Sequence, residues 1–298
     1  MKCCPFCTQE FESLEWRCPN CGWQPEKNNN IPIFSPETEH TSCGFKASSF
    51  ALLASLEAQY FWFRVRNELI TWALGKYGAN ISSFLEIGCG TGFVLQGIAK
   101  SFPKISLTGS DIYTEGLAFA TERIRGGEFI QTDAEKCPFI GEFDAIGAFD
   151  VLEHIENDNT VLQQIFRSLK SYGLLLLTVP QHRWLWSKVD ENACHMRRYT
   201  KRELHQKVSQ AGFKILRSTS FVTSLLPGIL LSRWMQRNKS DQAIGKNEFQ
   251  INPFLNCFFE KILHLELRLI QKGISLPLGC SRLIAAQKQE YQSLRGER

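Results

Sequence analysis

Apolar residues recur with two different spacings along this chain of 298 residues. Between about residues 82 and 180, short apolar runs alternate with segments long enough to form helices. The short runs are Phe84–Gly88, Ile105–Ser110, Glu128–Thr132, Phe143–Phe149 and Gly173–Val179. Strands that alternate with helices are joined by crossover connections, which place the strands parallel in one sheet. This region therefore predicts a doubly wound α/β sheet.

Two further strand-like runs lie near the end of the chain, at Phe213–Phe221 and Ser281–Gln287. They could close the sheet as a hairpin, with a helical insert of about Thr223–Gln271 between them. Upstream, Ser48–Lys76 has the periodicity of helices and is rich in aromatic residues. We expect residues 48–298 to form one domain.

The segment before this domain has a different composition. Residues 28–47 contain an asparagine triplet and two prolines, which predicts a linker. Five of the eleven cysteines lie in the first 21 residues, and four of them form two C-x-x-C knuckles: Cys4, Cys7, Cys18 and Cys21. Four thiolates at this spacing suit tetrahedral Zn²⁺, and so short a segment has no other core to fold around. We expect residues 1–27 to be a zinc-ribbon-like module with structural zinc, iron being the less favoured occupant.

Overall composition is that of a globular protein, with 43% hydrophobic and 21% charged residues. No apolar run approaches the roughly 20 residues that cross a bilayer, and the first residues lack the apolar core of a secretory signal. We therefore expect a cytoplasmic protein in which the scattered cysteines stay reduced.

Charge is distributed unevenly along the chain. Residues 1–194 carry 16 Lys and Arg against 23 Asp and Glu, a balance of −7, whereas residues 195–298 carry 18 against 7, a balance of +11. The second part is therefore where an anionic partner or the inner face of an anionic membrane would bind.

A glycine-rich stretch, FLEIGCGTGFVLQGIA, joins the first predicted strand to a helix. Glycine is needed where backbone turns tightly and approaches a ligand closely. A dinucleotide fingerprint, G-x-G-x-x-G, would require glycine at position 93, which is Phe93. The arrangement of Glu86, Gly88, Gly90 and Gly92 instead resembles motif I of class I S-adenosylmethionine (SAM)-dependent methyltransferases.

Further motifs extend this resemblance over about Phe84–Pro180. They are LTGSDI with Asp111, IQTDAEKCPF with Asp133, FDAIGAFDVLEHIEND and SLKSYGLLLLTVP, in the order that this family has them. HMRRYT, after the fifth strand, is similar to a stretch in bacterial small-molecule and cell-surface methyltransferases of type 11/12/23, including relatives of the ubiquinone O-methyltransferases. The resemblance implies a Rossmann-like sheet of seven strands.

The resemblance also implies SAM as cofactor. Asp111 would accept hydrogen bonds from both ribose hydroxyls, and Asp133 and Ala134 would meet the adenine. Arg66, in YFWFRVRN, could bind the methionine carboxylate, although it could equally be a surface residue beside core aromatics. The residues expected at the cofactor are Arg66, Glu86, Gly88, Cys89, Gly90, Asp111, Ile112, Asp133, Ala134 and Phe149.

A hydroxyl or amine acceptor must lose a proton, which calls for a base with a pKa near neutral. Ligands of doubly wound sheets lie at the carboxyl ends of the strands. His195 and His182, in the segment after the fifth strand, are our first and second candidates for this base. An equally open interpretation is that His195 and the neighbouring arginines only fasten this loop to the sheet.

We expect a SAM-dependent methyltransferase whose acceptor is a small molecule or is lipid-linked, with methylation at oxygen. One alternative is a ribosomal RNA methyltransferase with an N-terminal zinc module. That module carries three cationic and four acidic residues, a balance of −1, so nucleic acid is a less favoured partner. A second alternative is a protein with this fold that binds partners without catalysis.

Two apolar helical segments in the insert have more than one interpretation. In one, an apolar run is followed by cationic residues and tryptophan, at Arg233, Trp234, Arg237 and Lys239. In the other, Asn252 caps a helix with a broad apolar face. Both could bind the surface of an anionic membrane, or they could pack on the sheet or on each other as a lid or dimer face.

Overall fold

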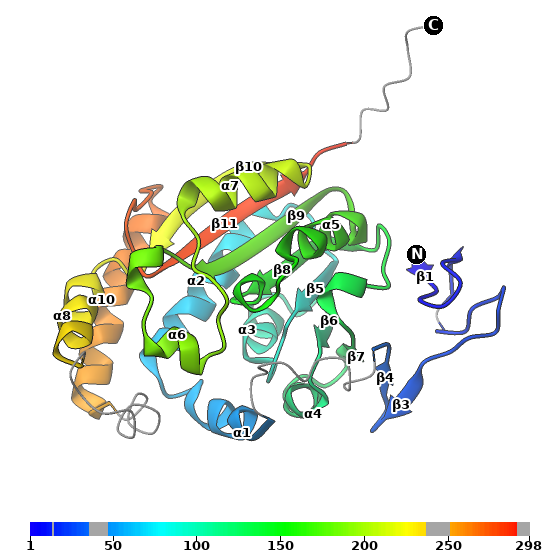
Figure 1. The fold of residues 1–298 in the computed structure, drawn as a ribbon, viewed down its shortest axis with the longest axis horizontal. Coiled ribbons are helices and arrows are strands. Elements are labelled where there is room, and N and C mark those ends of the chain that lie inside the picture. Colours follow the sequence, from blue (N-terminus) through cyan, green and yellow to red (C-terminus); the bar gives the residue numbers. More distant parts are fainter. Residues whose placement is uncertain (14, 36–46, 237–250, 291–298) are drawn as a thin grey trace, which may run out of the picture.

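A nine-stranded sheet runs through the part of the chain that the computed structural model describes, residues 1–13, 15–35, 47–236 and 251–290 (Figure 1). In sheet order its strands are β10 (Phe213–Phe221), β11 (Ser281–Lys288), β9 (Leu169–Pro180), β8 (Phe143–Phe149), β5 (Ser83–Ile87), β6 (Ser106–Asp111), β7 (Glu128–Gln131), β4 (Ile31–Ile33) and β3 (Glu26–Asn28). The strands from β7 to β9 are parallel, and β11 and β10 are antiparallel. This topology confirms the doubly wound sheet and its closing hairpin.

Helices cover both faces of the sheet (Figure 1). One face carries α2 (Phe61–Tyr77), α3 (Phe93–Ser101), α4 (Thr114–Arg123) and α10 (Pro253–Gln271); the other carries α5 (Asp158–Ser168) and α7 (Lys201–Gln210). Each helix buries residues that are three or four positions apart, such as Val161 and Ile165 in α5. The motifs at the carboxyl ends of β5, β6, β7 and β8 are thereby held at one edge of a rigid sheet.

The predicted linker contains a strand. Ile33 of β4 pairs with Gln131 of β7 in parallel, and β3 and β4 form an antiparallel hairpin beyond it. The sheet therefore has two strands more than the seven that the sequence predicts. A three-residue strand that contains Pro32 is too short to show alternation, and its proline suggests a turn.

The aromatic segment upstream of the sheet, for which the sequence predicts helical periodicity, forms two helices. These are α1 (Ala47–Leu56) and α2, and the chain turns between them at residues 57–60. Glu57 at this turn is buried, and its carboxylate accepts hydrogen bonds from Thr91 Oγ1 at 2.7 and 2.6 Å. A tertiary contact thus accounts for the break, which no Gly or Pro marks.

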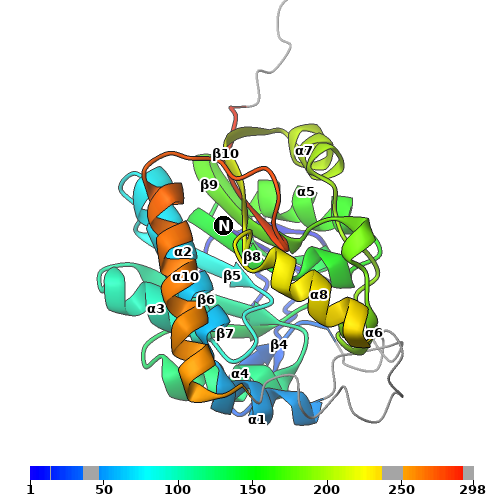
Figure 2. The same ribbon diagram turned by 90° about the vertical axis from the view of Figure 1, so that its left-hand side faces the viewer.

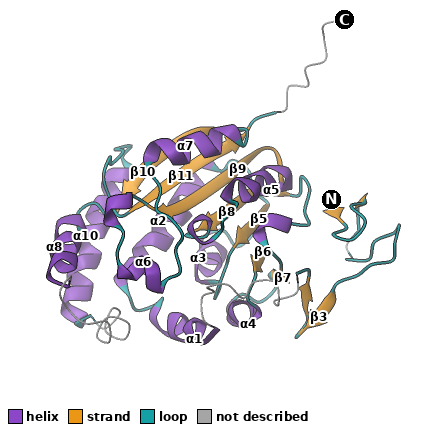
Figure 3. Cartoon of the chain, in the orientation of Figure 1, coloured by secondary structure: helices purple, strands orange, loops and turns teal. Residues whose placement is uncertain are grey.

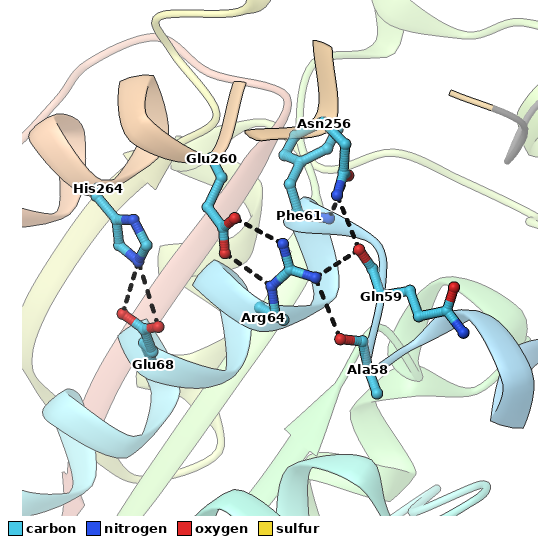
Figure 4. A network of polar contacts seen from close by, with 8 residues as sticks. All are labelled: Ala58, Gln59, Phe61, Arg64, Glu68, Asn256, Glu260 and His264. Carbon is cyan, nitrogen blue, oxygen red and sulfur yellow. Dashed lines mark hydrogen bonds and ion pairs between the residues drawn. The ribbon is translucent and has the colours of Figure 1, made fainter. Parts of the chain in front are cut away.

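The predicted insert is present between β10 and β11, as α8 (Leu226–Gln236) and α10. Figure 2 shows α10 lying along α2, and Figure 4 shows polar contacts that fasten the two. Arg64 of α2 donates two hydrogen bonds to Glu260, at 2.7 and 2.6 Å, and the side chain of Asn256 bonds the backbone of Gln59 and Phe61. The inner face of α10 therefore packs against α2, a neighbour that the sequence does not predict. Arg237 and Lys239 lie outside the described residues.

The N-terminal module is mostly loop (Figure 3). It contains the short hairpin β1 (Lys2–Cys3) and β2 (Glu10–Phe11). Backbone hydrogen bonds join it to the main domain, from Cys3 N to Pro138 O at 2.8 Å and from Ile140 N to Met1 O at 2.9 Å. Among the helices in the described ranges, none has the length and apolar character needed to cross a bilayer.

Candidate cofactor and active site

The glycine loop lies at the carboxyl end of β5 and leads into α3. Gly88 and Gly90 have φ values of 68° and 50°, which residues with a Cβ rarely adopt. A Cβ on Gly88 would lie only 2.4 Å from Cγ2 of Val151, which follows β8. Backbone geometry and close packing both require glycine there, and the loop opens the start of α3 to a ligand.

Asp111 fastens this loop from the end of β6. Its Oδ2 accepts a hydrogen bond from Gly90 N at 2.8 Å, and its Oδ1 accepts one from Tyr113 N at 2.9 Å. Burial raises the pKa of Asp111, and the backbone donors of Tyr113 and Gly90 oppose that rise. Each carboxylate oxygen can accept more than one hydrogen bond, so the predicted contact with a ribose remains open to this residue.

Arg66 and Glu86 place opposite charges in the interior next to the loop. Arg66 is 8% exposed, forms an ion pair with Asp150 (Nη2 to Oδ2, 2.5 Å) and has Cζ 5.1 Å from the Trp62 ring centroid. Burial raises the pKa of Glu86 well above its usual range, which Arg66 counteracts. Arg66 is therefore a buried residue and not the surface residue of the alternative interpretation.

Buried polar atoms of Arg66 and Glu86 lack hydrogen-bond partners among the described residues. These atoms are Arg66 Nε and Glu86 Oε2. Such groups are costly unless a ligand or water satisfies them. The methionine part of SAM carries an ammonium and a carboxylate, which would suit Glu86 and Arg66 respectively, while Asp111 would take the ribose. The residues present therefore fit SAM.

Ile112, predicted at the cofactor, and the two residues predicted for the adenine, Asp133 and Ala134, lie on two adjacent loops. Parallel pairing of Asp111 with Gln131 sets the ends of β6 and β7 side by side, so Ile112 and Asp133 follow at neighbouring positions. Asp133 Oδ1 accepts from Glu135 N at 2.9 Å and caps the short helix that begins at Ala134. Two other predicted contacts, Cys89 and Phe149, are buried within the core cluster around the sheet, and their contact with a cofactor stays a prediction.

A polar cluster that the sequence analysis did not identify covers the glycine loop. Glu57 binds Thr91 of the loop and forms an ion pair with Arg123 of α4 at 2.7 Å. Phe50 of α1 packs against Tyr113, with ring centroids 5.9 Å apart. The signal available in the sequence was an acidic residue, Glu57, in an apolar helical segment. Its role can be recognised only in the fold, which brings Glu57, Thr91 and Arg123 together.

His195 lies beside an oriented carboxylate. Its Nδ1 donates to Asp190 Oδ1 at 2.9 Å, and Arg198 Nε donates to the same oxygen at 2.7 Å. Asp190 is fully buried in α6 (Lys188–Asn192), where it also accepts from Ser187 N. Burial favours the neutral acid, but the hydrogen bonds from His195 and Arg198 outweigh it and bring the pKa of Asp190 to about 2. This arrangement leaves His195 Nε2 as the proton-accepting nitrogen.

His154 and Glu153 lie against His195. The rings of His154 and His195 are 4.8 Å apart at their centroids, and one ligand atom from each of these three residues lies within 4.8 Å of the others. Burial, with a smaller effect from His195, lowers the pKa of His154 to about 4. Among the described residues, neither carboxylate oxygen of Glu153 has a hydrogen-bond partner, so the three residues could together hold a cation or a polar group of a substrate.

His182 and the arginines of HMRRYT have different positions. The His182 ring contacts Gln181 Nε2 at 2.6 Å and lies 5.1 Å from Trp184, and none of its contacts in the described structure is with His195. Arg198 is buried against Asp190, and Arg197 forms an ion pair with Asp158 at 3.1 Å. The two arginines thus fasten the loop, whereas His195 of the same loop lies against Glu153 and His154.

A family model described as methyltransferase domain matches residues 56–218, more than half of the chain. The chain belongs to this family. The match begins at the turn that carries Glu57 and includes the glycine loop, Asp111, Asp133 and the His195 loop of the methyltransferase domain.

The methyltransferase domain resembles several curated proteins. It is 31% identical over 122 residues to a malonyl-[acyl-carrier protein] O-methyltransferase of Bacillus cereus. The aligned region covers 40% of this chain and 45% of that protein. It is 28% identical over 159 residues to a fatty-acid O-methyltransferase of Mycolicibacterium smegmatis, covering 51% and 58%. The chain thus spans about half the length of these relatives.

Solved structures show the same fold. A methyltransferase from Haloferax volcanii, solved with the Trm112 activator, is similar with a TM-score of 0.56 and 15% identity, covering 83% of this chain and 98% of that one. Phosphoethanolamine N-methyltransferase 2 of Haemonchus contortus, solved with SAM, has a TM-score of 0.51 and 22% identity, covering 76% and 52%.

The four predicted zinc ligands of the N-terminal module lie together. Cys4 Sγ is 3.7 Å from Cys21 Sγ, and Cys7 Sγ is 3.6 Å from Cys18 Sγ. Zinc–sulfur bonds of about 2.3 Å at tetrahedral angles place sulfur atoms about 3.8 Å apart. The cysteines therefore fit a zinc ion.

Proposed function

We propose that the protein transfers a methyl group from SAM to a hydroxyl oxygen of a small-molecule or lipid-linked acceptor. The observation that carries this proposal is the placement of unpaired Arg66 and Glu86 atoms beside the glycine loop, at the same edge of the sheet as the Asp190–His195 pair. The names of two curated relatives, which are O-methyltransferases of malonyl-acyl-carrier protein and of fatty acid, support an oxygen acceptor with an attached acyl or lipid group.

In this reaction the residues of the chain would have the following roles. Glu86 and Arg66 bind the two charged groups of the methionine part, and Asp111 and the loop that carries Asp133 orient the nucleoside. SAM, when bound, supplies a methyl group on a positively charged sulfur. The chain would hold the acceptor beside that methyl group, and α1, whose Phe50 packs against Tyr113, would help to exclude water.

His195 would take the proton of the acceptor hydroxyl on Nε2. Asp190, which accepts from Nδ1, stabilises the imidazolium that results and holds the ring in place. His182, our second candidate, has a pKa that burial and then the nearby Arg282 and Arg198 lower. In the part of the chain that the structure describes, its contacts are with Gln181 and Trp184 and not with an orienting carboxylate, which favours His195 as the base.

Transfer of labelled methyl from SAM into the lipid, small-molecule and RNA fractions of a cell extract tests the acceptor class. Label in the lipid or small-molecule fraction, released by chemistry that cleaves methyl ethers, is expected. Label released by mild ester hydrolysis would instead indicate a carboxylate acceptor. Label confined to RNA would replace the proposal by the RNA methyltransferase alternative. No transfer by protein that binds SAM would favour a binding protein.

His195→Ala tests the base. Loss of a general base lowers kcat by about 10²–10⁴-fold while leaving SAM affinity unchanged. His182→Ala is the matched control and is expected to affect kcat less. A carboxylate acceptor is already ionised at neutral pH, so an unchanged kcat in a folded His195→Ala variant would reject the hydroxyl acceptor and the base together.

A further inference from the structure

Gln131, the last residue of β7, joins three segments of the chain. Its side chain is fully buried, with Oε1 accepting from Ser35 N at 3.1 Å and Nε2 donating to Ile112 O at 3.0 Å. Its backbone carbonyl accepts from Phe34 N at 2.9 Å. The side-chain amide of Gln131 therefore connects Ser35, in the segment after β4, to the loop that follows Asp111.

The same connection reaches the second predicted nucleoside loop. Asp133 lies two residues beyond Gln131, and its backbone N donates to Ser35 Oγ at 3.3 Å. Ser35, two residues beyond the end of β4, is buried. The end of β7 and the loop after it are thus hydrogen-bonded directly to a segment that comes from outside the usual seven strands, and the loop after β6 is joined to that segment through the side chain of Gln131.

Aromatic rings connect that segment with the cysteine module. Phe34 packs against Trp16 and Trp23, with ring centroids 4.5 and 5.7 Å apart. Trp16 precedes Cys18 by two residues and Trp23 follows Cys21 by two. A module this small owes its fold to its metal, so the positions of both tryptophans would depend on the four cysteines being held.

We propose that Gln131 is a positioning residue through which the cysteine module sets the affinity for the nucleoside part of SAM. The proposal rests on the proposed SAM site and adds to it a control from outside the methyltransferase domain. With the module folded, Phe34 and Ser35 are fixed and Gln131 orders both loops; without it, the same loops lose buried hydrogen bonds and the nucleoside meets a less ordered site.

Two ligands separate this effect from a general loss of the site. 5′-Methylthioadenosine retains the adenine and ribose of SAM but lacks the amino-acid part. Gln131→Met keeps the length of the side chain and removes both hydrogen bonds, so the Kd of SAM and of methylthioadenosine should rise by the same factor, about tenfold. Arg66→Met, in contrast, should weaken SAM and leave methylthioadenosine unchanged. Unchanged affinity for methylthioadenosine in folded Gln131→Met would overturn the role of Gln131.

A second pair of variants leaves the cofactor loops intact. Trp16→Leu removes the ring that packs on Phe34, whereas Phe6→Leu removes an aromatic residue of the same module that is 77% exposed. We expect weaker binding of methylthioadenosine with Trp16→Leu and wild-type binding with Phe6→Leu. Equal affinities for both variants would overturn the coupling even if Gln131→Met does not fold.

Hydrogen exchange on the full chain provides a readout that needs neither cofactor nor activity. Removal of metal with a chelator, checked by elemental analysis, should speed exchange of backbone amides at residues 31–35 and 131–134 as well as in the module. Faster exchange confined to residues 1–27 would reject the coupling. Failure of the wild-type protein to bind SAM would instead reject the proposed function, and the exchange result would still decide the coupling.

Discussion

Asp111 shows how one residue can serve both the protein backbone and a ligand. Its two oxygens already hold Gly90 N and Tyr113 N, so it fixes the loop before any cofactor arrives. We predict that Asp111→Ala lowers SAM affinity at least tenfold, because the loop loses its fastening and the ribose loses a charged acceptor. Calorimetry measures this, with circular dichroism to verify the fold. Unchanged affinity in a folded variant would contradict the assignment.

Asp190 should make stability depend on pH. Its pKa of about 2 in the folded protein lies below that of an unfolded aspartate, so the unfolded state binds the proton more readily. The stabilisation is complete above about pH 4 and is lost as the pH falls through about 2, and it amounts to about 2 kcal/mol.

Asp190→Asn tests this at the same position. The variant should be less stable than the wild type at pH 7, and the gap in the free energy of unfolding should shrink at pH 3 and below. Urea titrations at several pH values measure it. A gap that is constant with pH would show that the carboxylate charge is not what stabilises this loop.

Single residues also mark the limit of the sequence analysis. Gly88, Asp111 and the four cysteines follow motifs with fixed local spacing, so their positions could be predicted. Glu57 and Gln131 have no such motif, because their partners lie 34 and 96 residues away in sequence. The sequence shows that Asp190 lies five residues before His195. It does not show the hydrogen bond between them, which depends on the path of the chain from α6 to His195.

At the scale of elements, the strands that form distinct apolar runs were predicted and the shortest ones were not. Strand β5 buries four of its five residues, and β9 buries its last eight. β4 has three residues, one of them Pro32, and is held by the edge of β7. Its strand character comes from the neighbouring strand and cannot be detected in its own sequence.

The cysteine module is the element with the clearest chemical test. Elemental analysis of protein purified without added metal should give about one zinc per chain, as four thiolates in this geometry imply. Cys18→Ser should abolish it, because Cys18 is almost fully buried among the ligands, whereas Cys257→Ser, an exposed cysteine of α10, should not. Iron in place of zinc, or a metal-free wild-type protein, would contradict the prediction.

At the scale of the whole molecule, the position of α10 bears on how a lipid-linked acceptor would reach the site. Its inner face is fixed on α2, while Phe254 and Phe258 on its outer face are 79% and 51% exposed. Both lie at the end of α10 where Asn256 binds the turn at Gln59, next to the helices that cover the cofactor loop (Figure 4). An apolar surface there could bring the site to a lipid-linked acceptor on a membrane.

Vesicle co-sedimentation tests whether α10 and the basic segment 195–298 bind an anionic membrane. Binding is expected with vesicles that contain anionic phosphatidylglycerol and not with neutral phosphatidylcholine alone, and it should weaken as salt screens the charges. The double variant Phe254→Ser and Phe258→Ser should bind at least tenfold more weakly, because two large apolar side chains no longer enter the interface. Phe6→Ser, which changes an equally exposed phenylalanine in the cysteine module, should bind as the wild type does. Absence of sedimentation at low salt would instead assign the outer face of α10 to contact with protein.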